Sequence, residues 1–286
     1  MLHSPDGPVA PLCGVRLTGP MRDWTDTAEA YDRSFATLCA GTAARILEDL
    51  PAGALLDVGC GTGRLAAQAE RMGRTVTALD ADSSMVEAAR EHLRGHVLRE
   101  ALPDLPLADE STDAIAANFV INHVGRPRAA LAELRRVLRP GGRLAMSIWP
   151  VGGASWSTML GEVFEEAGAV LPPPERLPVD EDFDRTSEGL AALAREAGLD
   201  VEQACELHWD WRIRPDDLWA GLAAGIATPG AVVRAQTPPV RARIREIFSA
   251  RTAGAAGPDG ILHFPVRAAY VLASLPDVTP PAHVRR

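Results

Sequence analysis

The chain has 286 residues, a formal net charge of −9 and 47% hydrophobic residues, enough for the core of one catalytic domain with additions. The acidic balance argues against a nucleic-acid substrate, because phosphate binding requires a basic face. The sequence contains no lysine, which excludes chemistry through a lysine Schiff base.

The cysteines and the apolar runs predict the compartment. Cys13, Cys39, Cys60 and Cys205 are scattered without a C-x-x-C pair, which is typical of reduced thiols, and no metal site is expected. No apolar run reaches the length of a membrane span, and residues 1–8 lack the basic and apolar blocks of a signal peptide. We therefore expect a cytoplasmic protein without a membrane partner. Its arginine-, alanine- and proline-rich composition is typical of a GC-rich bacterial genome.

The first 50 residues predict a tail and a helical lid. Residues 1–20 are rich in proline and glycine, as poorly ordered termini often are. Residues 21–50 carry apolar side chains at helical spacing, among them Trp24 and Tyr31, and Pro51 with Gly53 ends the pattern. This boundary separates residues 1–50 from a central α/β region over 51–150.

Residues 55–63, Leu-Leu-Asp-Val-Gly-Cys-Gly-Thr-Gly, predict a buried strand that enters a glycine turn, and a helix over 65–72 follows. The glycines let the main chain pass close to a ligand because no Cβ intervenes, and the start of the helix offers free N–H groups. Residues 74–80 predict a second strand that ends in Asp80, where doubly wound folds bind ribose hydroxyls.

The spacing of the glycines discriminates among nucleotide-like cofactors. Gly59, Gly61 and Gly63 form G-x-G-x-G, whereas dinucleotide enzymes use G-x-G-x-x-G. The phosphate-binding G-x-x-x-x-G-K-[ST] motif does not occur. A pyrophosphate binder would be expected to have one of these two motifs, so the pattern favours an adenosine-containing cofactor without phosphates.

The alternation of strands and helices continues to residue 150. A polar turn at 109–113 leads into a fourth strand that ends near Asn118. A helix is predicted over 126–138, and residues 140–142, Pro-Gly-Gly, stop it before a fifth strand over 143–149.

Residues 151–286 are predicted to complete the sheet and to build one wall of a substrate pocket. Helices are expected over 155–169, 186–197 and 218–224 and after Pro239, and strands over 201–213 and 261–272. On the strand over 201–213, Trp209 and Trp211 share a face with Leu207, which favours core packing.

The turn at 57–63, Asp-Val-Gly-Cys-Gly-Thr-Gly, resembles that of the class I S-adenosylmethionine-dependent methyltransferases. The resemblance spans residues 52–149 and includes the family's Leu-x-Pro-Gly-Gly at 138–142. Within the family, the chain looks most like the small-molecule enzymes related to quinone C-methyltransferases. The resemblance implies an α/β, Rossmann-like fold with a seven-stranded, mostly parallel sheet of order 3-2-1-4-5-7-6. It also implies S-adenosyl-L-methionine as cofactor and S-adenosyl-L-homocysteine as product.

The resemblance assigns cofactor contacts to individual residues. Asp57 would meet the methionine end, the main chain of Gly59 and Gly61 would pass beside the methionyl and ribose portions, and Asp80 would bind the ribose. The family's acid for the adenine amino group is replaced here by Ala101, so either Glu100 or the backbone of Ala101 and Leu102 would serve. The expected cofactor site comprises Tyr31, Arg33, Asp57, Gly59, Cys60, Gly61, Gly63, Asp80, Ala81, Met85, Ala101, Leu102, Asn118, Phe119 and His123.

Methyl transfer depends mainly on holding nucleophile, methyl carbon and sulfur in line. If the acceptor is weakly acidic, a base helps, and His123 is the candidate because it follows the fourth strand. Packing, or a hydrogen bond to the cofactor, explains His123 equally well. Trp24, Trp149 and Trp156 are expected to line a pocket for a flat, conjugated acceptor.

These features favour methyl transfer to a small organic molecule in bacterial specialised metabolism, such as antibiotic biosynthesis. We expect a monomer or a homodimer with no nucleic-acid partner. Two alternatives keep the cofactor site: a non-methylating reaction such as cyclisation, and a non-catalytic binding protein. The intact glycine turn and Asp80 argue against the second alternative, and the glycine spacing makes a dinucleotide oxidoreductase the least favoured reading.

Overall fold

The computed structural model describes residues 27–152, 155–173 and 177–277. Its centre is a seven-stranded sheet of order β3-β2-β1-β4-β5-β7-β6, which confirms the predicted fold. Strands β1 to β5 run parallel, and β7 is antiparallel to both of its neighbours, β5 and β6. The strands are β1 (Ala54–Val58), β2 (Thr75–Asp80), β3 (His96–Arg99), β4 (Thr112–Asn118), β5 (Leu138–Ile148), β6 (Asp200–Ile213) and β7 (Leu262–Ser274).

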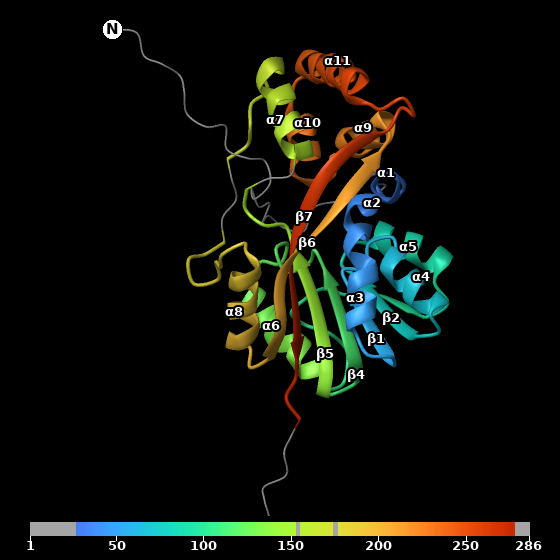
Figure 1. Cartoon of the computed structure of the whole chain (residues 1–286), viewed down its shortest axis with the longest axis vertical. Coiled ribbons are helices and arrows are strands. Elements are labelled where there is room, and N and C mark those ends of the chain that lie inside the picture. The colour runs from blue at the N-terminus through green and yellow to red at the C-terminus, as the bar shows by residue number, and fades with distance from the viewer. Residues whose placement is uncertain (1–26, 153–154, 174–176, 278–286) are drawn as a thin grey trace, which may run out of the picture.

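Helices cover both faces of the sheet (Figure 1). One face packs against α3 (Ala43–Asp49), α4 (Arg64–Arg71) and α5 (Ser83–His92) through a core cluster that includes Ile46, Ala66 and Val86. The other face packs against α6 (Pro127–Val137) and α8 (Ser187–Glu196). This is the layering expected of βαβ units, in which each crossover helix buries its apolar stripe on the sheet.

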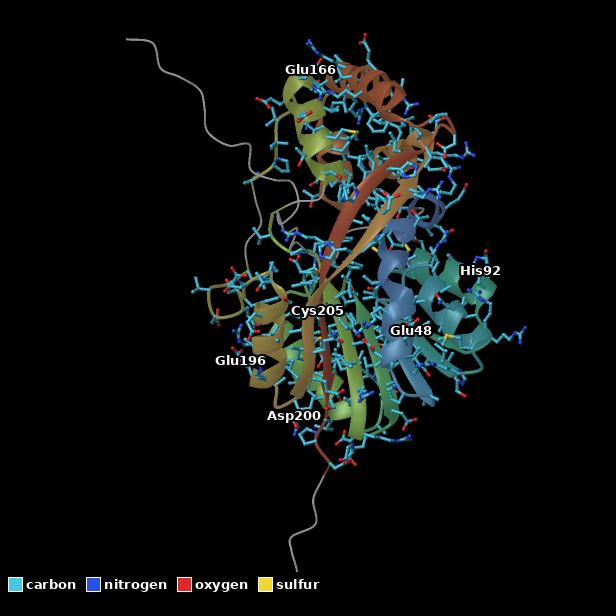
Figure 2. All side chains as sticks on the ribbon, viewed as in Figure 1. Glu48, His92, Glu166, Glu196, Asp200 and Cys205 are labelled. Carbon is cyan, nitrogen blue, oxygen red and sulfur yellow. The ribbon has the colours of Figure 1, made fainter. Side chains whose placement is uncertain are left out.

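The β6–β7 hairpin is longer than the other strands and extends past the sheet into a group of helices, here called the helical cap (Figure 1). The cap consists of α7 (Ser155–Ala167), α9 (Pro215–Ala223), α10 (Ala227–Ala235) and α11 (Pro238–Ala255). From Asp200 at the base of the sheet, β6 runs past Cys205 toward the cap, where Glu166 marks the outer end of α7 (Figure 2). A separate apolar cluster fills the cap, and Trp211 and Phe264 of the hairpin belong to it.

The lid is helical, as predicted, but it is broken into short pieces. These are α1 (Ala28–Arg33), α2 (Phe35–Cys39), the 3-10 turn η1 (Ala40–Thr42) and α3. The first break is at Ser34, whose hydroxyl donates to the Ala30 carbonyl at 2.5 Å and whose backbone leaves the helical region. A serine hydroxyl that bonds to the preceding turn competes with the helical backbone bonds in this way.

One predicted boundary was wrong, and one helix was not predicted. Strand β5 begins at Leu138, not at residue 143, because Leu138 already pairs with Thr112 and residues 139–142 form a bulge before Arg143 pairs with Ala114. Helix α10, which contains Pro229 and Gly230, was not predicted. Proline is tolerated in a first helical turn, and Gly230 allows close contact, since a Cβ there would lie 2.4 Å from the Gly225 carbonyl carbon.

Over the described ranges, no single helix is long and apolar enough to cross a membrane, although α9 and α10 meet that test jointly as a pair bent by 63°.

Candidate functional site

The glycine turn has the backbone conformation that its sequence predicts. Gly59, Gly61 and Gly63 have φ angles of 62°, 55° and 84°, in the left-handed region that favours glycine. The backbone N–H of Cys60 donates to the Leu79 carbonyl at 2.9 Å, which fastens the turn to β2. The turn therefore lies at the carboxyl end of β1, directly before α4.

Asp80, the last residue of β2, is held against this turn by the backbone. One carboxylate oxygen accepts the Gly61 N–H at 2.9 Å and the other accepts the Asp82 N–H at 3.0 Å. Burial raises the pKa of the Asp80 carboxyl, and the backbone N–H groups partly oppose that shift. Each carboxylate oxygen has a second lone pair, so Asp80 can still accept hydrogen bonds from a pair of hydroxyls.

Asp57 is a buried acid with an unused acceptor. It is 1% exposed, and its Oδ2 atom has no hydrogen-bond partner among the described residues. Burial raises the pKa of its carboxyl to about 7, opposed by the backbone N–H of Ala66 and reinforced by the nearby Asp80. A buried carboxylate oxygen without a partner is costly, so its retention is an argument for a ligand that donates to it.

Asp57 lines a hollow of about 410 Å³, including its open mouth, between the glycine turn and the lid. The lid contributes Tyr31, whose ring lies over Gly61 so closely that a Cβ there would be 3.0 Å from Tyr31 Cε1. Asp32 fixes the lid in place, because its carboxylate accepts from the Thr62 hydroxyl and from Arg64 Nε, both at 2.7 Å.

Asn118 joins the lid to the sheet at the carboxyl end of β4. Its Oδ1 accepts the hydroxyls of Thr42 and Ser147 at 2.7 and 2.6 Å, and its Nδ2 donates to the Cys39 carbonyl at 3.0 Å. Asn118 was predicted to lie at the reactive end of the cofactor. It does line the hollow, but all of these side-chain hydrogen bonds go to the protein itself.

The other residues expected in the cofactor site lie in different surroundings. Arg33 is directed away from it, because its guanidinium is 3.2 Å from Asp217 of α9. Met85 of α5 is buried, whereas Ala101 is exposed. His123 is exposed, with its Nε2 3.3 Å from Asn122 Nδ2.

The aromatic candidates divide between two places. Trp149, half-buried just after β5, stacks on Phe119 with ring centroids 3.9 Å apart, and Trp209 lies 6.0 Å from Trp149. Trp156 instead is buried in the cap cluster, 5.9 Å from Trp211. Trp24 lies outside the described residues.

The sequence did not reveal the roles of Asp32 and Thr62, which hold the lid. Trp209, expected to pack in the core, is half-buried and packs against the cap cluster, and its ring also lies beside Trp149. The only sequence signal for Asp32 and Thr62 was their position next to Tyr31 and within the glycine turn. Neither position reveals that the two side chains meet.

The residues around the hollow fit an adenosyl-methionine type of cofactor. A carboxylate held at the strand end suits a ribose, a main chain without Cβ atoms allows close approach, and the unpartnered Asp57 oxygen suits an ammonium group. The hollow also contains no lysine that could hold a phosphate.

Comparison with known proteins agrees with this geometry. Residues 56–146 match the family model described as a methyltransferase domain. The chain is 38% identical over 132 residues to a malonyl-[acyl-carrier protein] O-methyltransferase of Pectobacterium atrosepticum, covering 45% of this chain and 52% of that one. It is 34% identical over 168 residues to a ubiquinone biosynthesis O-methyltransferase of Xylella fastidiosa, covering 56% and 66%. The chain thus spans about half to two thirds of the length of these relatives.

Among solved structures, the [4+2]-cyclase SpnF superposes with a TM-score of 0.51 at 19% identity, covering 90% of this chain and 98% of that one. That likeness is one of fold alone. The family model, the curated relatives and the geometry of the glycine turn point the same way. Residues 56–146 therefore form a methyltransferase domain of the class I S-adenosylmethionine-dependent family, whose cofactor is S-adenosyl-L-methionine.

Proposed function

We propose that this protein transfers a methyl group from S-adenosyl-L-methionine to a small organic acceptor in bacterial specialised metabolism. The observation that carries the proposal is the pairing of two acids around one glycine turn. Asp80 is fixed by the Gly61 N–H, and Asp57 is buried with an unpartnered oxygen. Together they are suited to hold two parts of the cofactor, with Asp80 on the ribose and Asp57 on the methionine portion.

In this proposal, positioning does most of the catalytic work. The cofactor supplies an activated methyl group, and the protein holds the acceptor in line with it and excludes water. The lid supports this arrangement, because Asp32 fastens it to Thr62 and Arg64 and Asn118 fastens it to the end of β4. With the lid closed, we expect the acceptor to approach from the carboxyl ends of β4 and β5.

A flat acceptor agrees with the aromatic side chains at those strand ends. Phe119 follows β4, Trp149 follows β5, and their rings are stacked with an interplanar angle of 15°. Aromatic surfaces of this kind favour conjugated ligands through stacking and burial. The proposal therefore assigns a conjugated small molecule as acceptor, with Trp149 on the wall of its pocket.

The reaction class is tested with a donor that carries an isotopically labelled methyl group. Mass spectrometry of the product is expected to show the label on the acceptor. An unlabelled product formed at full rate would replace methyl transfer by a cofactor-assisted reaction such as cyclisation.

We expect His123→Ala to slow turnover about 10²-fold, because we propose His123 as the base that accepts the acceptor's proton. The measurement is kcat at saturating donor, using the acceptor that the labelled assay identifies. His208→Ala is the matched control, because His208 lies on β6 with 67% of its side chain exposed. A loss of kcat below tenfold in the His123 variant would show that His123 is not the base and has a packing role.

Cofactor affinity is expected to rise with pH through the pKa of Asp57, about 7. An ionised Asp57 attracts the ammonium of the methionine portion, whereas a protonated one must first lose its proton. Affinity for S-adenosyl-L-homocysteine, measured calorimetrically, should therefore increase by up to about tenfold per pH unit below pH 7 and level off above it. Asp57→Asn should remove this dependence. Adenosine, which lacks the methionine portion, should show the same pH dependence in both proteins.

The raised pKa of Asp57 also determines how the stability of the folded protein changes with pH. The folded protein holds a proton on Asp57 up to about pH 7, whereas the unfolded chain releases it near 4. Because the folded state binds more protons between these values, the contribution of Asp57 to stability falls as pH rises from 4 to 7. Without ligand, Asp57→Asn should lack that decline.

A further inference from the structure

Arg185 is a buried arginine with an unused donor. Its side chain is 9% exposed, and its Nη1 atom is buried without a hydrogen-bond acceptor among the described residues. The other terminal nitrogen, Nη2, donates to Asp182 Oδ1 at 2.7 Å, and the guanidinium carbon lies 3.6 Å from the centre of the Phe183 ring. Buried polar groups nearly always have a partner, so an unsatisfied guanidinium nitrogen requires an explanation.

The main chain of Arg185 lies beside the segment that follows β5. The Arg185 carbonyl accepts the backbone N–H of Val151 at 3.0 Å, three residues beyond the end of β5. Phe183, on which the guanidinium stacks, packs against the core cluster that contains Ile121 and Ile148. Ile148 ends β5, and Ile121 follows β4 by three residues. Ligands of open α/β sheets bind at this edge.

Neighbouring arginines are engaged with the protein. Arg267 donates to Glu206 at 2.8 Å and to the Val151 carbonyl at 3.1 Å, and Arg128 donates to Glu196 at 3.0 Å. The Nη1 of Arg245 is also buried and has no partner in the described part of the chain, but Arg245 lies on α11 of the cap with 40% of its side chain exposed. Arg185 alone among these four combines near-complete burial, an unpartnered nitrogen and a place beside the strand ends.

We propose that Arg185 binds a carboxylate on the methyl acceptor, so that the acceptor is an aromatic carboxylic acid. The proposal rests on the proposed function, since it assigns a substrate class to the same site. Phe183 fixes the plane of the guanidinium, and Asp182 occupies only one of its terminal nitrogens. The planar guanidinium of arginine can donate two parallel hydrogen bonds to a carboxylate, whereas the ammonium of lysine acts as a point charge. Trp149, two residues before Val151, supplies the aromatic surface for the ring.

The test compares two probes of the same shape, 4-hydroxybenzoate and its uncharged analogue 4-hydroxybenzamide. Each is titrated by tryptophan fluorescence into the full-length protein, alone and saturated with S-adenosyl-L-homocysteine. The wild type is expected to bind the acid about 10- to 100-fold more tightly than the amide, as a charged hydrogen-bonding partner should produce. Arg185→Gln should bring the two affinities within about twofold, and Arg185→Lys should retain only part of the preference.

Arg195→Gln is the matched control, because Arg195 pairs with Glu188 on the exposed face of α8, and it should keep the full preference. Equal binding of acid and amide by the wild type would overturn the proposal, as would failure of the acid to bind. This comparison needs no variant, so the proposal stays testable if Arg185→Gln does not fold. A preference that persists in a folded Arg185→Gln protein would reduce Arg185 to a structural role. Normal binding of S-adenosyl-L-homocysteine without any preference for the acid refutes this inference alone, whereas absent cofactor binding contradicts the proposed function.

Discussion

Gly61→Val is expected to abolish binding of S-adenosyl-L-homocysteine in calorimetry. A Cβ at Gly61 would lie 3.0 Å from Cε1 of Tyr31, whose side chain lines the hollow, even without a ligand. The two methyl groups of valine would fill the space in which the cofactor passes the main chain. The φ of 55° adds strain of about 1–3 kcal/mol for a side chain with a branched Cβ.

A control substitution at a second glycine distinguishes a specific loss of ligand binding from a general loss of stability. Gly73 has a φ of 83°, and a Cβ there would meet no atom within 4 Å. Gly73→Val therefore carries a similar backbone strain away from the hollow, and it should bind the ligand normally while showing a comparable fall in melting temperature. Unchanged affinity in a folded Gly61→Val protein would mean that the cofactor does not lie against this turn.

Asp80→Ala is expected to weaken cofactor binding by about 1.5–3 kcal/mol, roughly 10- to 150-fold, because it removes charge-assisted hydrogen bonds to the ribose. Adenosine should lose affinity by the same factor, since it carries the same ribose. This distinguishes Asp80 from Asp57, whose substitution should affect only ligands with a methionine portion. Calorimetric titration of both ligands into the variant is the measurement.

Asp113→Ala provides the control for Asp80→Ala. The Asp113 carboxylate also accepts a backbone N–H, that of Ala54 at 3.0 Å, and pairs with Arg139 at 2.6 Å. It lies near the start of β4, at the opposite edge of the sheet from the glycine turn. Its loss should lower stability without changing ligand affinity. An equal loss of affinity in the two variants would show that Asp80 acts through folding and not through contact.

The glycine turn and the sheet were predictable because their signals are local. Gly59, Gly61 and Gly63 permit the left-handed backbone of a tight turn wherever the rest of the chain lies, and Asp80 is placed by the end of its own strand. The alternation along β6 likewise identified its buried face before any partner was known, with Trp211 buried and His208 exposed.

The arrangement of the lid and of the acceptor side could not be predicted, since it depends on contacts between distant residues. Asp32 meets Thr62 across 30 positions and Asn118 meets Cys39 across 79, and no local pattern encodes either pair. Arg33 was expected to approach the cofactor, but α9 packs beside α1 and presents Asp217 to it. Arg185 gave no signal in the sequence because its burial depends on the end of β5 and on Phe183.

The most direct test of the central claim, that this glycine turn and its two acids hold an adenosyl-methionine cofactor, is calorimetry on the unmodified protein. Titrations with S-adenosyl-L-methionine and S-adenosyl-L-homocysteine should each give saturable heat at one site per chain, and NADH should give none. Absence of heat from both sulfur ligands, or saturable binding of NADH in their place, would contradict it.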